Sequence, residues 1–448
     1  MKGPRNAFLP LLLAWAGVFA VWSPSLSGGF LKDDESNFLA NPVVQDPARW
    51  PAFFYVKSAN SLERELTVAY RPLATLSYAV TARLAGFNPF FFHLLDVAGH
   101  AANAALVLLL GWELCGSLPA AAAGAALFAF HPAQAESVSY VSGARPSVFS
   151  LLLGLLALRE HLKGRRARGL ALFALSALFK ESALGLPFAL AAWDWTGPPR
   201  RPLREVARGA APYFAVSLLF FAVRGAVLVH TTDSGLFGGR LSTHIVFALS
   251  GMAAHARSAA WPYGQRLCYT LADPAPWTPA AAGGLILAAL AFLLARGLRD
   301  RRPWLPPLAW ACAFLLPVSN LVIPVSSLAQ DRYLYASFAG LGWLVALAAA
   351  RATRRSAWIP AAALAAWLVP AALERQWDWQ SAFTIDLAGR AASDDACGSA
   401  VLAIDYFKWG MDGRARALVR EGQARRPAST VRAYLKTVDR LLDARAER

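Results

Sequence analysis

Long apolar blocks separated by short polar stretches dominate the pattern of this chain. Examples are residues 101–110, 280–295 and 341–350. A helix needs about 20 mostly apolar residues to cross the hydrocarbon core of a bilayer. Lipid offers no hydrogen-bond partners, so the backbone inside it must satisfy its own polar groups, and a helix does this within one segment. The pattern therefore predicts an all-α polytopic membrane protein.

The apolar blocks predict a bundle of about eleven transmembrane helices. One block, residues 169–195, is interrupted by Lys180–Glu181. It can form one long helix or two short helices that turn at this dipeptide. Counting it as two, the expected spans lie near residues 8–23, 91–110, 118–130, 148–158, 169–195, 212–229, 280–295, 304–318, 334–350 and 358–372.

Basic residues decide between these alternatives. The formal net charge is +16, although only 16% of the residues are charged. Most of the basic residues form short clusters between apolar blocks, as cytoplasmic loops do in membrane proteins. The clusters lie at residues 159–168, 200–208, 296–302 and 351–355. Only two short helices keep 200–208 on the cytoplasmic side, so we predict two. This topology explains the charge and gives no reason to expect nucleic-acid binding.

Three polar segments complete the predicted topology. Residues 28–90 form a long first extracytoplasmic loop whose aromatic residues favour interfacial helices, although 72–84 could be a short span. Residues 245–261 are expected to be interfacial or re-entrant. The chain is polar and helical from residue 373 to residue 448. We expect 1–372 to form the transmembrane domain and 373–448 to form a short extracytoplasmic helical tail.

The tail has a pattern of its own. Residues 400–408 and 413–421 predict one helix–turn–helix unit, and 431–444 a further helix. The unit could be a remnant of a tetratricopeptide-type repeat, although a self-supporting array needs about three units. The four cysteines are scattered and suggest neither a disulfide framework nor a metal-binding CxxC site.

Polar residues gather at the predicted outer ends of the spans, where ionisable groups are functional candidates. Asp33 and Asp34 follow the first span. A carboxylate there can take a proton from an attacking hydroxyl, hold a divalent metal, or be a solvated helix cap. His131 and Glu136 lie at another outer end. They could hydrogen-bond a sugar or a phosphate-linked head group, or simply form a polar helix terminus.

Four cations also lie at outer boundaries: Arg71, Arg145, Lys180 and Arg332. Arginine binds phosphate through two parallel hydrogen bonds, and lysine acts as a point charge. Each cation alone could be a side chain that extends along the membrane surface. Arg145, Lys180 and Arg332 are expected at the same outer level of the membrane, which favours a shared anion site.

A polar stripe marks the second span, where His93, Asp96, His100 and Asn103 share one helical face. Such a stripe could bind a metal, but hydrogen bonding between helices explains it better. The sequence contains no phosphate-binding loop and no nucleophile-elbow motif. This argues against an enzyme that consumes nucleotides.

Several of these polar stretches match one family in order and spacing. The matching motifs are Lys32–Asp33–Asp34 with Asn41–Pro42, Tyr70–Arg71–Pro72–Leu73, His93 with His100 and Asn103, His131–Pro132 with Glu136–Ser137–Val138, Lys180 with Leu186–Pro187–Phe188 and Asp194–Trp195, and Gln330–Asp331–Arg332–Tyr333. With these motifs the chain resembles the bacterial relatives of the transmembrane and tetratricopeptide-repeat O-mannosyltransferases. These are membrane glycosyltransferases of the GT-C type.

The resemblance implies a GT-C-like catalytic domain in a bacterial inner membrane, with its active site facing outwards. It implies that a sugar, mannose in the family, passes from a polyprenyl-phosphate-linked donor to a hydroxyl of an extracytoplasmic acceptor, often a protein Ser or Thr. Asp33 would be the catalytic carboxylate, with Asp34 as neighbour or substitute, and both are the candidates for any divalent metal. His131 and Glu136 would line the donor sugar. The phosphate would contact Arg71, Arg145, Lys180 and Arg332.

The chain departs from the family pattern in two places. The family has an acid after the basic residue of the His-Pro segment, whereas Arg145–Pro146 is followed here by Ser147. Relatives carry long repeat arrays, whereas this tail is short. Two alternatives stay open: a transporter or flippase of a lipid-linked sugar, and a non-catalytic scaffold of the same fold. A transporter should carry its polar groups near the middle of the membrane, so the outer-end position of Asp33 favours the enzyme.

Overall fold

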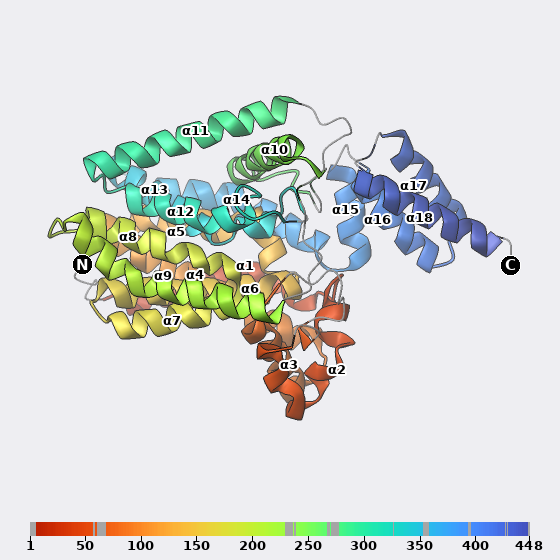
Figure 1. The fold of residues 1–448 in the computed structure, drawn as a ribbon, viewed down its shortest axis with the longest axis horizontal. Coiled ribbons are helices and arrows are strands. Elements are labelled where there is room, and N and C mark those ends of the chain that lie inside the picture. Colours follow the sequence, from red (N-terminus) through yellow and green to blue (C-terminus); the bar gives the residue numbers. More distant parts are fainter. Residues whose placement is uncertain are drawn as a thin grey trace.

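The computed structural model describes residues 6–56, 59–60, 69–228, 236, 239–266, 269, 277–325, 327–352, 358–392, 396–425, 427 and 429–446. Within these residues the regular structure is entirely helical, without a strand. Most of the helices run side by side in one bundle, from which a small lobe and a helical tail project (Figure 1). The prediction of an all-α membrane protein is confirmed.

The helices alternate with short turns of tighter or wider helix. In chain order the α-helices are α1 (Phe8–Trp22), α2 (Pro42–Gln45), α3 (Pro72–Ala85), α4 (Pro89–Cys115), α5 (Leu118–Phe130), α6 (Val141–Leu162), α7 (Arg166–Phe179), α8 (Leu186–Thr196), α9 (Leu203–Val227), α10 (Leu241–Ala260), α11 (Trp277–Asp300), α12 (Leu305–Leu315), α13 (Ser337–Ala352), α14 (Ile359–Asp378), α15 (Ala382–Ala392), α16 (Cys397–Lys408), α17 (Asp412–Ala424) and α18 (Ser429–Ala446). The short elements are η1 (Ser23–Ser27), η2 (Glu35–Leu39), η3 (Pro47–Phe54), η5 (Pro132–Ser137), η6 (Glu181–Gly185), η8 (Leu316–Val318) and η9 (Asp331–Tyr333).

Five helical segments among the described residues are long and apolar enough to cross a membrane, judged by length and composition. They are Phe8–Ser27, Pro89–Cys115, Val141–Leu162, Leu203–Val227 and Trp277–Asp300. Other apolar helices of the bundle are shorter, such as α5 with 13 residues and α13 with 16. The number of about eleven spans stays a prediction.

The interrupted block at 169–195 forms two helices, as predicted. α7 ends at Phe179 and α8 begins at Leu186, with η6 between them. The far end of α8 returns to the level where α6 ends, because His161 Nε2 lies 3.3 Å from an Asp194 carboxylate oxygen. Lys180 and Glu181 therefore lie at the turn of a helical hairpin.

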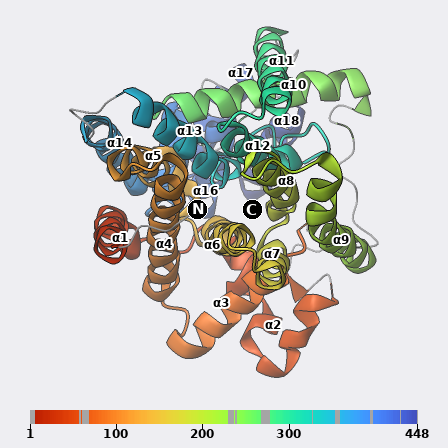
Figure 2. The same cartoon turned by 90° about the vertical axis from the view of Figure 1, so that its left-hand side faces the viewer.

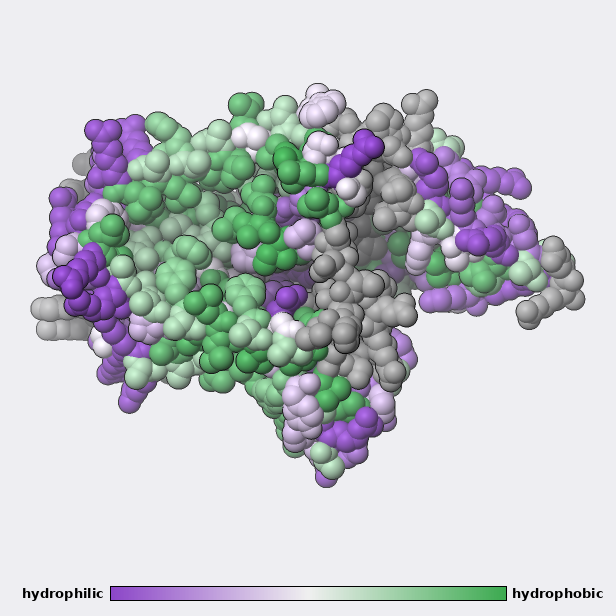
Figure 3. Space-filling view, viewed as in Figure 1, coloured by the Kyte–Doolittle hydropathy of each residue, from purple (hydrophilic) through white to green (hydrophobic). Residues whose placement is uncertain are grey.

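The turns that carry the basic clusters lie at one end of the bundle. The Trp195 indole at the end of α8 donates to the Leu298 carbonyl at 2.8 Å, and the Arg301 guanidinium covers its ring at 3.7 Å. Figure 3 shows hydrophilic residues at this end and an apolar band over the bundle beside it. This separation matches cytoplasmic loops beside a lipid-facing surface. The predicted basic cluster 351–355 lies mostly outside the described residues.

Two expected boundaries changed. α6 begins at Val141, seven residues before the predicted block 148–158, so Arg145 and Ser147 lie within a helix. Pro146 lies inside this helix, where it removes one intrahelical hydrogen bond without ending α6. α14 continues to Asp378, past the predicted boundary at 372.

The predicted interfacial stretch at 245–261 is helix α10, which lies across the bundle (Figure 2). α11 packs tightly on it. A Cβ atom at Gly283 would approach the Leu249 carbonyl oxygen to 1.8 Å, so only glycine allows this crossing. The first-loop stretch 72–84 is α3, part of the lobe with α2, and is absent from the candidate spans of the described residues.

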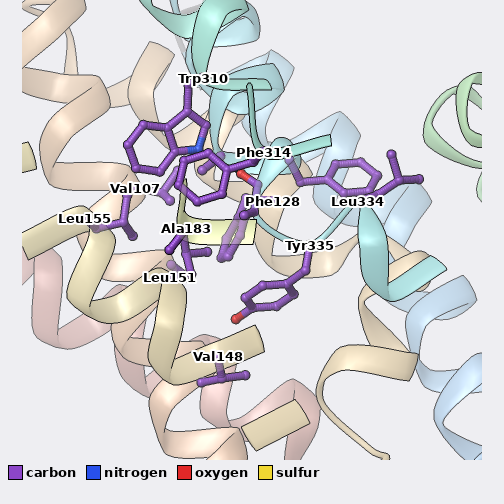
Figure 4. Close-up of a cluster of buried hydrophobic side chains, with 14 of the residues drawn as sticks. Val107, Phe128, Val148, Leu151, Leu155, Ala183, Trp310, Phe314, Leu334 and Tyr335 are labelled. Atoms are coloured by element: carbon purple, nitrogen blue, oxygen red, sulfur yellow. The ribbon is translucent and has the colours of Figure 1, made fainter. Parts of the chain in front are cut away.

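The polar stripe of α4 forms hydrogen bonds between helices, as predicted. His100 Nδ1 lies 2.9 Å from the Tyr335 hydroxyl, and Asn103 donates to the same oxygen at 3.0 Å. Asp96 pairs with Arg145 at 2.6 Å. Around Tyr335, apolar side chains from several helices form a continuous core (Figure 4). The site described below lies above this core.

The tail has its own small core. α16 and α17 form the predicted helix–turn–helix unit, and α18 packs against it through buried side chains such as Leu435, Val438 and Leu442. Its relation to a tetratricopeptide repeat stays a prediction. Cys397 at the start of α16 is disulfide-bonded, although the scattered cysteines suggested no disulfide framework. Spacing in sequence carried no signal for it.

Candidate functional site

Three short turns and the first loop meet at the end of the bundle that faces away from the basic turns. The turn η5 packs on η9, and α6 contacts both η6 and η9. α5 ends at Phe130 because Pro132 cannot donate a backbone hydrogen bond to continue the helix. Most of the polar residues predicted from sequence lie on these turns or in the first loop. Their side chains differ sharply in burial and pairing.

Asp33 and Asp34 point in different directions. Asp34 is fully buried, and its two oxygens accept backbone hydrogen bonds from Leu31 and Ser142, both at 2.8 Å. Burial raises the pKa of Asp34 to about 7. Asp33 is exposed, and its backbone N–H donates to the Tyr140 hydroxyl at 3.2 Å. Asp34 therefore anchors the turn, while Asp33 presents a carboxylate to solvent.

Tyr140 connects Asp33 to the rest of the site. Its ring is buried and stacks on Trp379 with 5.6 Å between the ring centroids. Burial raises the pKa of Tyr140 well above its ordinary value, and the nearby Asp33 carboxylate adds to this rise. The phenol therefore stays neutral and can hydrogen-bond a polar ligand beside Asp33. Sequence reasoning missed Tyr140 because an aromatic residue in an outer loop carries no specific pattern.

Glu136 and His131 stabilise the turns. Glu136 is buried and forms an ion pair with the Arg332 guanidinium, and it also accepts from the Arg332 backbone N–H at 2.9 Å. His131 is buried and accepts from the Ala133 backbone N–H at 3.3 Å, and its ring lies tilted against Phe338 with 4.4 Å between the ring centroids. Burial lowers the pKa of His131 to about 3, so the ring is neutral. Both residues border the site, but their described contacts are to protein.

Lys180 is the cation of the site without a carboxylate partner among the described residues. Its ammonium donates to the Ser147 hydroxyl at 2.8 Å and lies 3.5 Å from the Arg332 carbonyl. Arg71, in contrast, forms a bidentate pair with Glu181, with bonds of 2.9 and 2.5 Å. Burial, together with the neighbouring Arg71 and Arg332 cations, lowers the pKa of Lys180 to about 7. These three cations therefore leave an excess of positive charge.

A small pocket opens beside this charge. Its wall contains Lys180 and Arg332, apolar side chains, and five hydroxyl groups. The hydroxyls belong to Ser147, Ser150, Ser182, Tyr333 and Tyr335. Sequence reasoning noted Ser147 only as a departure from the family and missed the other four. The empty space is only about 10 Å³, the size of one water molecule. The charge and the hydroxyl groups of its wall match the chemistry of a phosphate oxygen, and a larger ligand has to bind at the mouth of the pocket.

Arg145 lies apart from the other predicted cations. It is almost fully buried and pairs with Asp96 on α4. Its remaining nitrogens donate to Ser77, Thr81 and the Phe92 carbonyl at 3.2–3.3 Å. All three guanidinium nitrogens are thus engaged by protein. The structure joins Arg71, Lys180 and Arg332 around one site, whereas Arg145 holds α3, α4 and α6 together.

The two aspartates differ in what they can offer a divalent metal. Asp34 uses both oxygens for backbone hydrogen bonds, which leaves only the Asp33 carboxylate to face a ligand. The described residues contain no group of three side chains that could hold a metal ion. Calcium takes six to eight oxygen ligands, whereas magnesium keeps several waters and can be held by one carboxylate together with a substrate phosphate. A metal at Asp33 stays a prediction, and the chemistry proposed below does not depend on it.

Comparison with known proteins gives relatives of one kind. The chain is 36% identical to the protein O-mannosyl-transferase TMTC1 of Mus musculus over 175 residues, which is 36% of this chain and 18% of that protein. It is 32% identical to Tmtc1 of Drosophila melanogaster over 182 residues, covering 37% and 20%. It is 30% identical to TMTC2 of Mus musculus over 152 residues, covering 34% and 18%.

The chain thus matches only about a fifth of the length of these relatives. No family model and no solved structure matches it. The similarity is nevertheless consistent across relatives from mammals and insects, and each is named a protein O-mannosyl-transferase. Over about a third of its length, this chain is a relative of the protein O-mannosyl-transferases TMTC1 and TMTC2.

Proposed function

We propose that this chain is a GT-C-type membrane glycosyltransferase. It moves a sugar, mannose by analogy with its relatives, from a polyprenyl-phosphate-linked donor to a Ser or Thr hydroxyl of an extracytoplasmic protein. The observation that carries this proposal is the uncompensated Lys180 ammonium in a hydroxyl-lined pocket, whose other cation, Arg332, interacts electrostatically with the exposed Asp33 carboxylate. An anion-binding cation and a free carboxylate are the two groups that the reaction needs.

The donor phosphate binds at the cationic wall. Lys180 supplies a point charge and the Arg332 guanidinium supplies further N–H donors at the same wall. Glu136 fixes the Arg332 backbone and side chain, so the donors are oriented before the ligand arrives. Such preorganised donors stabilise negative charge as it develops on a leaving group. Burial around Lys180 strengthens this interaction because water screens it less.

The reaction is a single displacement at the anomeric carbon. The acceptor oxygen forms a bond to this carbon as the bond to the phosphate oxygen breaks. The acceptor proton passes to the Asp33 carboxylate, and the phosphate leaves on its lipid with the bonding electrons. A positioned carboxylate contributes about 10²–10⁴-fold to such a step. Tyr140 lies beside Asp33 and can hydrogen-bond the sugar or the acceptor.

The site faces the outside of a bacterial inner membrane in this proposal. The basic turns lie at the opposite end of the bundle (Figure 3), which supports a cytoplasmic position for that end. The disulfide at Cys397 supports an outward tail, because disulfides persist in oxidising compartments such as the periplasm. The proposal keeps the predicted count of about eleven spans, which places the C-terminus outside.

The test is sugar transfer by the purified protein in lipid nanodiscs. Polyprenyl-phosphate sugars and Ser/Thr-containing acceptor peptides are offered to wild type, Asp33→Asn and Glu35→Gln, with and without chelator. Glu35 is an exposed carboxylate two residues from Asp33, which makes it a matched control. We expect transfer by wild type and Glu35→Gln, and a loss of at least a hundredfold in Asp33→Asn. Movement of sugar lipid across a vesicle bilayer without transfer would instead identify a flippase.

A further inference from the structure

A row of hydrogen bonds joins the start of the first loop to the junction of α14 and α15. The Ser25 hydroxyl donates to Gln376 and the Ser27 hydroxyl donates to Gln380, both at 3.0 Å. The Gly29 backbone N–H donates to the Gln380 carbonyl, also at 3.0 Å. The first loop and the start of the tail are thus one connected layer, although about 350 residues of sequence lie between them.

The row ends in an ion pair next to the candidate catalytic carboxylate. The Lys32 ammonium donates to both oxygens of Asp386 on α15, at 2.6 and 2.5 Å. The Asp386 side chain is fully buried, whereas the Lys32 side chain is 25% exposed. Burial and the neighbouring Asp405 raise the pKa of Asp386 to about 7, and Lys32 opposes this rise. The pair is therefore a specific, enclosed contact between the tail and the first loop.

Lys32 has an unusual backbone conformation. Its φ angle is +44°, in the left-handed region that L side chains rarely adopt. Such a conformation persists only where the surrounding structure holds it. The next residue is Asp33, whose carboxylate has no ion-pair partner among the described residues, although an ammonium on a flexible stem is its neighbour in sequence.

The contact with Asp386 explains why the Asp33 carboxylate is unpaired although the Lys32 ammonium is its neighbour in sequence. We propose that Asp386 is a positioning residue that draws the Lys32 ammonium away from Asp33 and holds the turn, so that the Asp33 carboxylate stays unpaired and available as a base. The tail is then part of the catalytic unit. The role of Asp33 in this inference rests on the proposed function. The contact itself does not.

A double substitution tests this inference, because it should raise kcat above that of the single Asp386→Asn variant. Asp386→Asn frees the ammonium to pair with Asp33, so we expect kcat to fall at least tenfold while KM for the donor stays within about threefold. Lys32→Met combined with Asp386→Asn leaves no ammonium to interfere, so kcat should recover at least fivefold over Asp386→Asn alone. Glu421→Gln is the control, because it breaks an ion pair inside the tail, with Arg390. A double variant as slow as Asp386→Asn overturns the proposal, as does an unimpaired Asp386→Asn.

A second readout needs no enzyme activity. A carbodiimide joins an ammonium to a carboxylate that it touches, and mass spectrometry of the digested protein locates the bond. We expect a 32–386 cross-link in wild type, and in Asp386→Asn a 32–33 link or reduced labelling of Asp33 by a small amine. Absence of the 32–386 link, or unchanged labelling of Asp33, contradicts the inference. If transfer fails with all donors while these links form, only the proposed function fails.

Discussion

The Lys180 ammonium donates a 2.8 Å hydrogen bond to the Ser147 hydroxyl. Ser147 is the position at which the chain departs from the acid that we expect from its family resemblance. A carboxylate there would neutralise the lysine, whereas a hydroxyl leaves its charge uncompensated. The departure, which cast doubt on activity from sequence alone, therefore adds an anion-binding group to the site. It also makes the charge at Lys180 the feature most open to experiment.

Ser147→Asp should weaken binding of the donor phosphate. The new carboxylate would pair with Lys180 in a buried setting and compete with the ligand. We expect the Kd for a polyprenyl phosphate in nanodiscs to rise at least tenfold, measured by a fluorescence or calorimetric titration. Ser147→Ala is the matched control, since it removes only one hydroxyl, and its Kd should stay within about threefold of wild type. Equal affinity of Ser147→Asp and wild type would contradict the assignment of Lys180 to the phosphate.

Donor affinity should also depend on pH. The pKa of Lys180 is lowered to about 7 by burial and by neighbouring cations, so the ammonium is present below pH 7 and is lost as the pH rises above it. A bound phosphate favours the charged form, which shifts the midpoint upward in the complex. We expect constant affinity from pH 5.5 to 6.5 and progressive weakening by at least fivefold up to pH 9. Lys180→Arg keeps its charge throughout, and its affinity should show no such loss; a parallel loss in this variant would assign the titration to another group.

The sequence was informative where chain order and charge alone decide the structure. Lys180–Glu181 interrupts an apolar block, and the basic cluster after it required a hairpin, which the structure contains. Asp33 and Asp34, in contrast, are chemically alike, and only the fold buries one and exposes the other. Arg145 was grouped with the cations of the site because the predicted span began only at residue 148, which placed Arg145 at an outer boundary. The helix in fact starts at Val141 and turns this guanidinium toward Asp96.

The two aspartates should separate into catalysis and stability. Asp33→Asn should abolish transfer and leave the thermal unfolding temperature within about 1 °C of wild type, because its carboxylate is exposed. Asp34→Ala should leave the Leu31 and Ser142 N–H groups without their acceptors, at a cost of about 1–3 kcal/mol each. We expect a clear fall in its unfolding temperature in nanodiscs. A stable Asp34→Ala variant without activity would instead make Asp34 the reacting carboxylate.

The buried pair between Arg145 and Asp96 should be structural. Both side chains are at most 1% exposed, and the arginine also contacts Ser77 and Thr81 on α3. Arg145→Met leaves Asp96 as an unpaired buried charge, which costs about 3–5 kcal/mol. Arg145→Met with Asp96→Leu removes both charges and should recover most of that loss. Thermal unfolding in nanodiscs measures the stability, and the affinity for polyprenyl phosphate below the unfolding temperature should match wild type in the double variant. If the double variant folds well but no longer binds the phosphate, Arg145 belongs to the donor site after all.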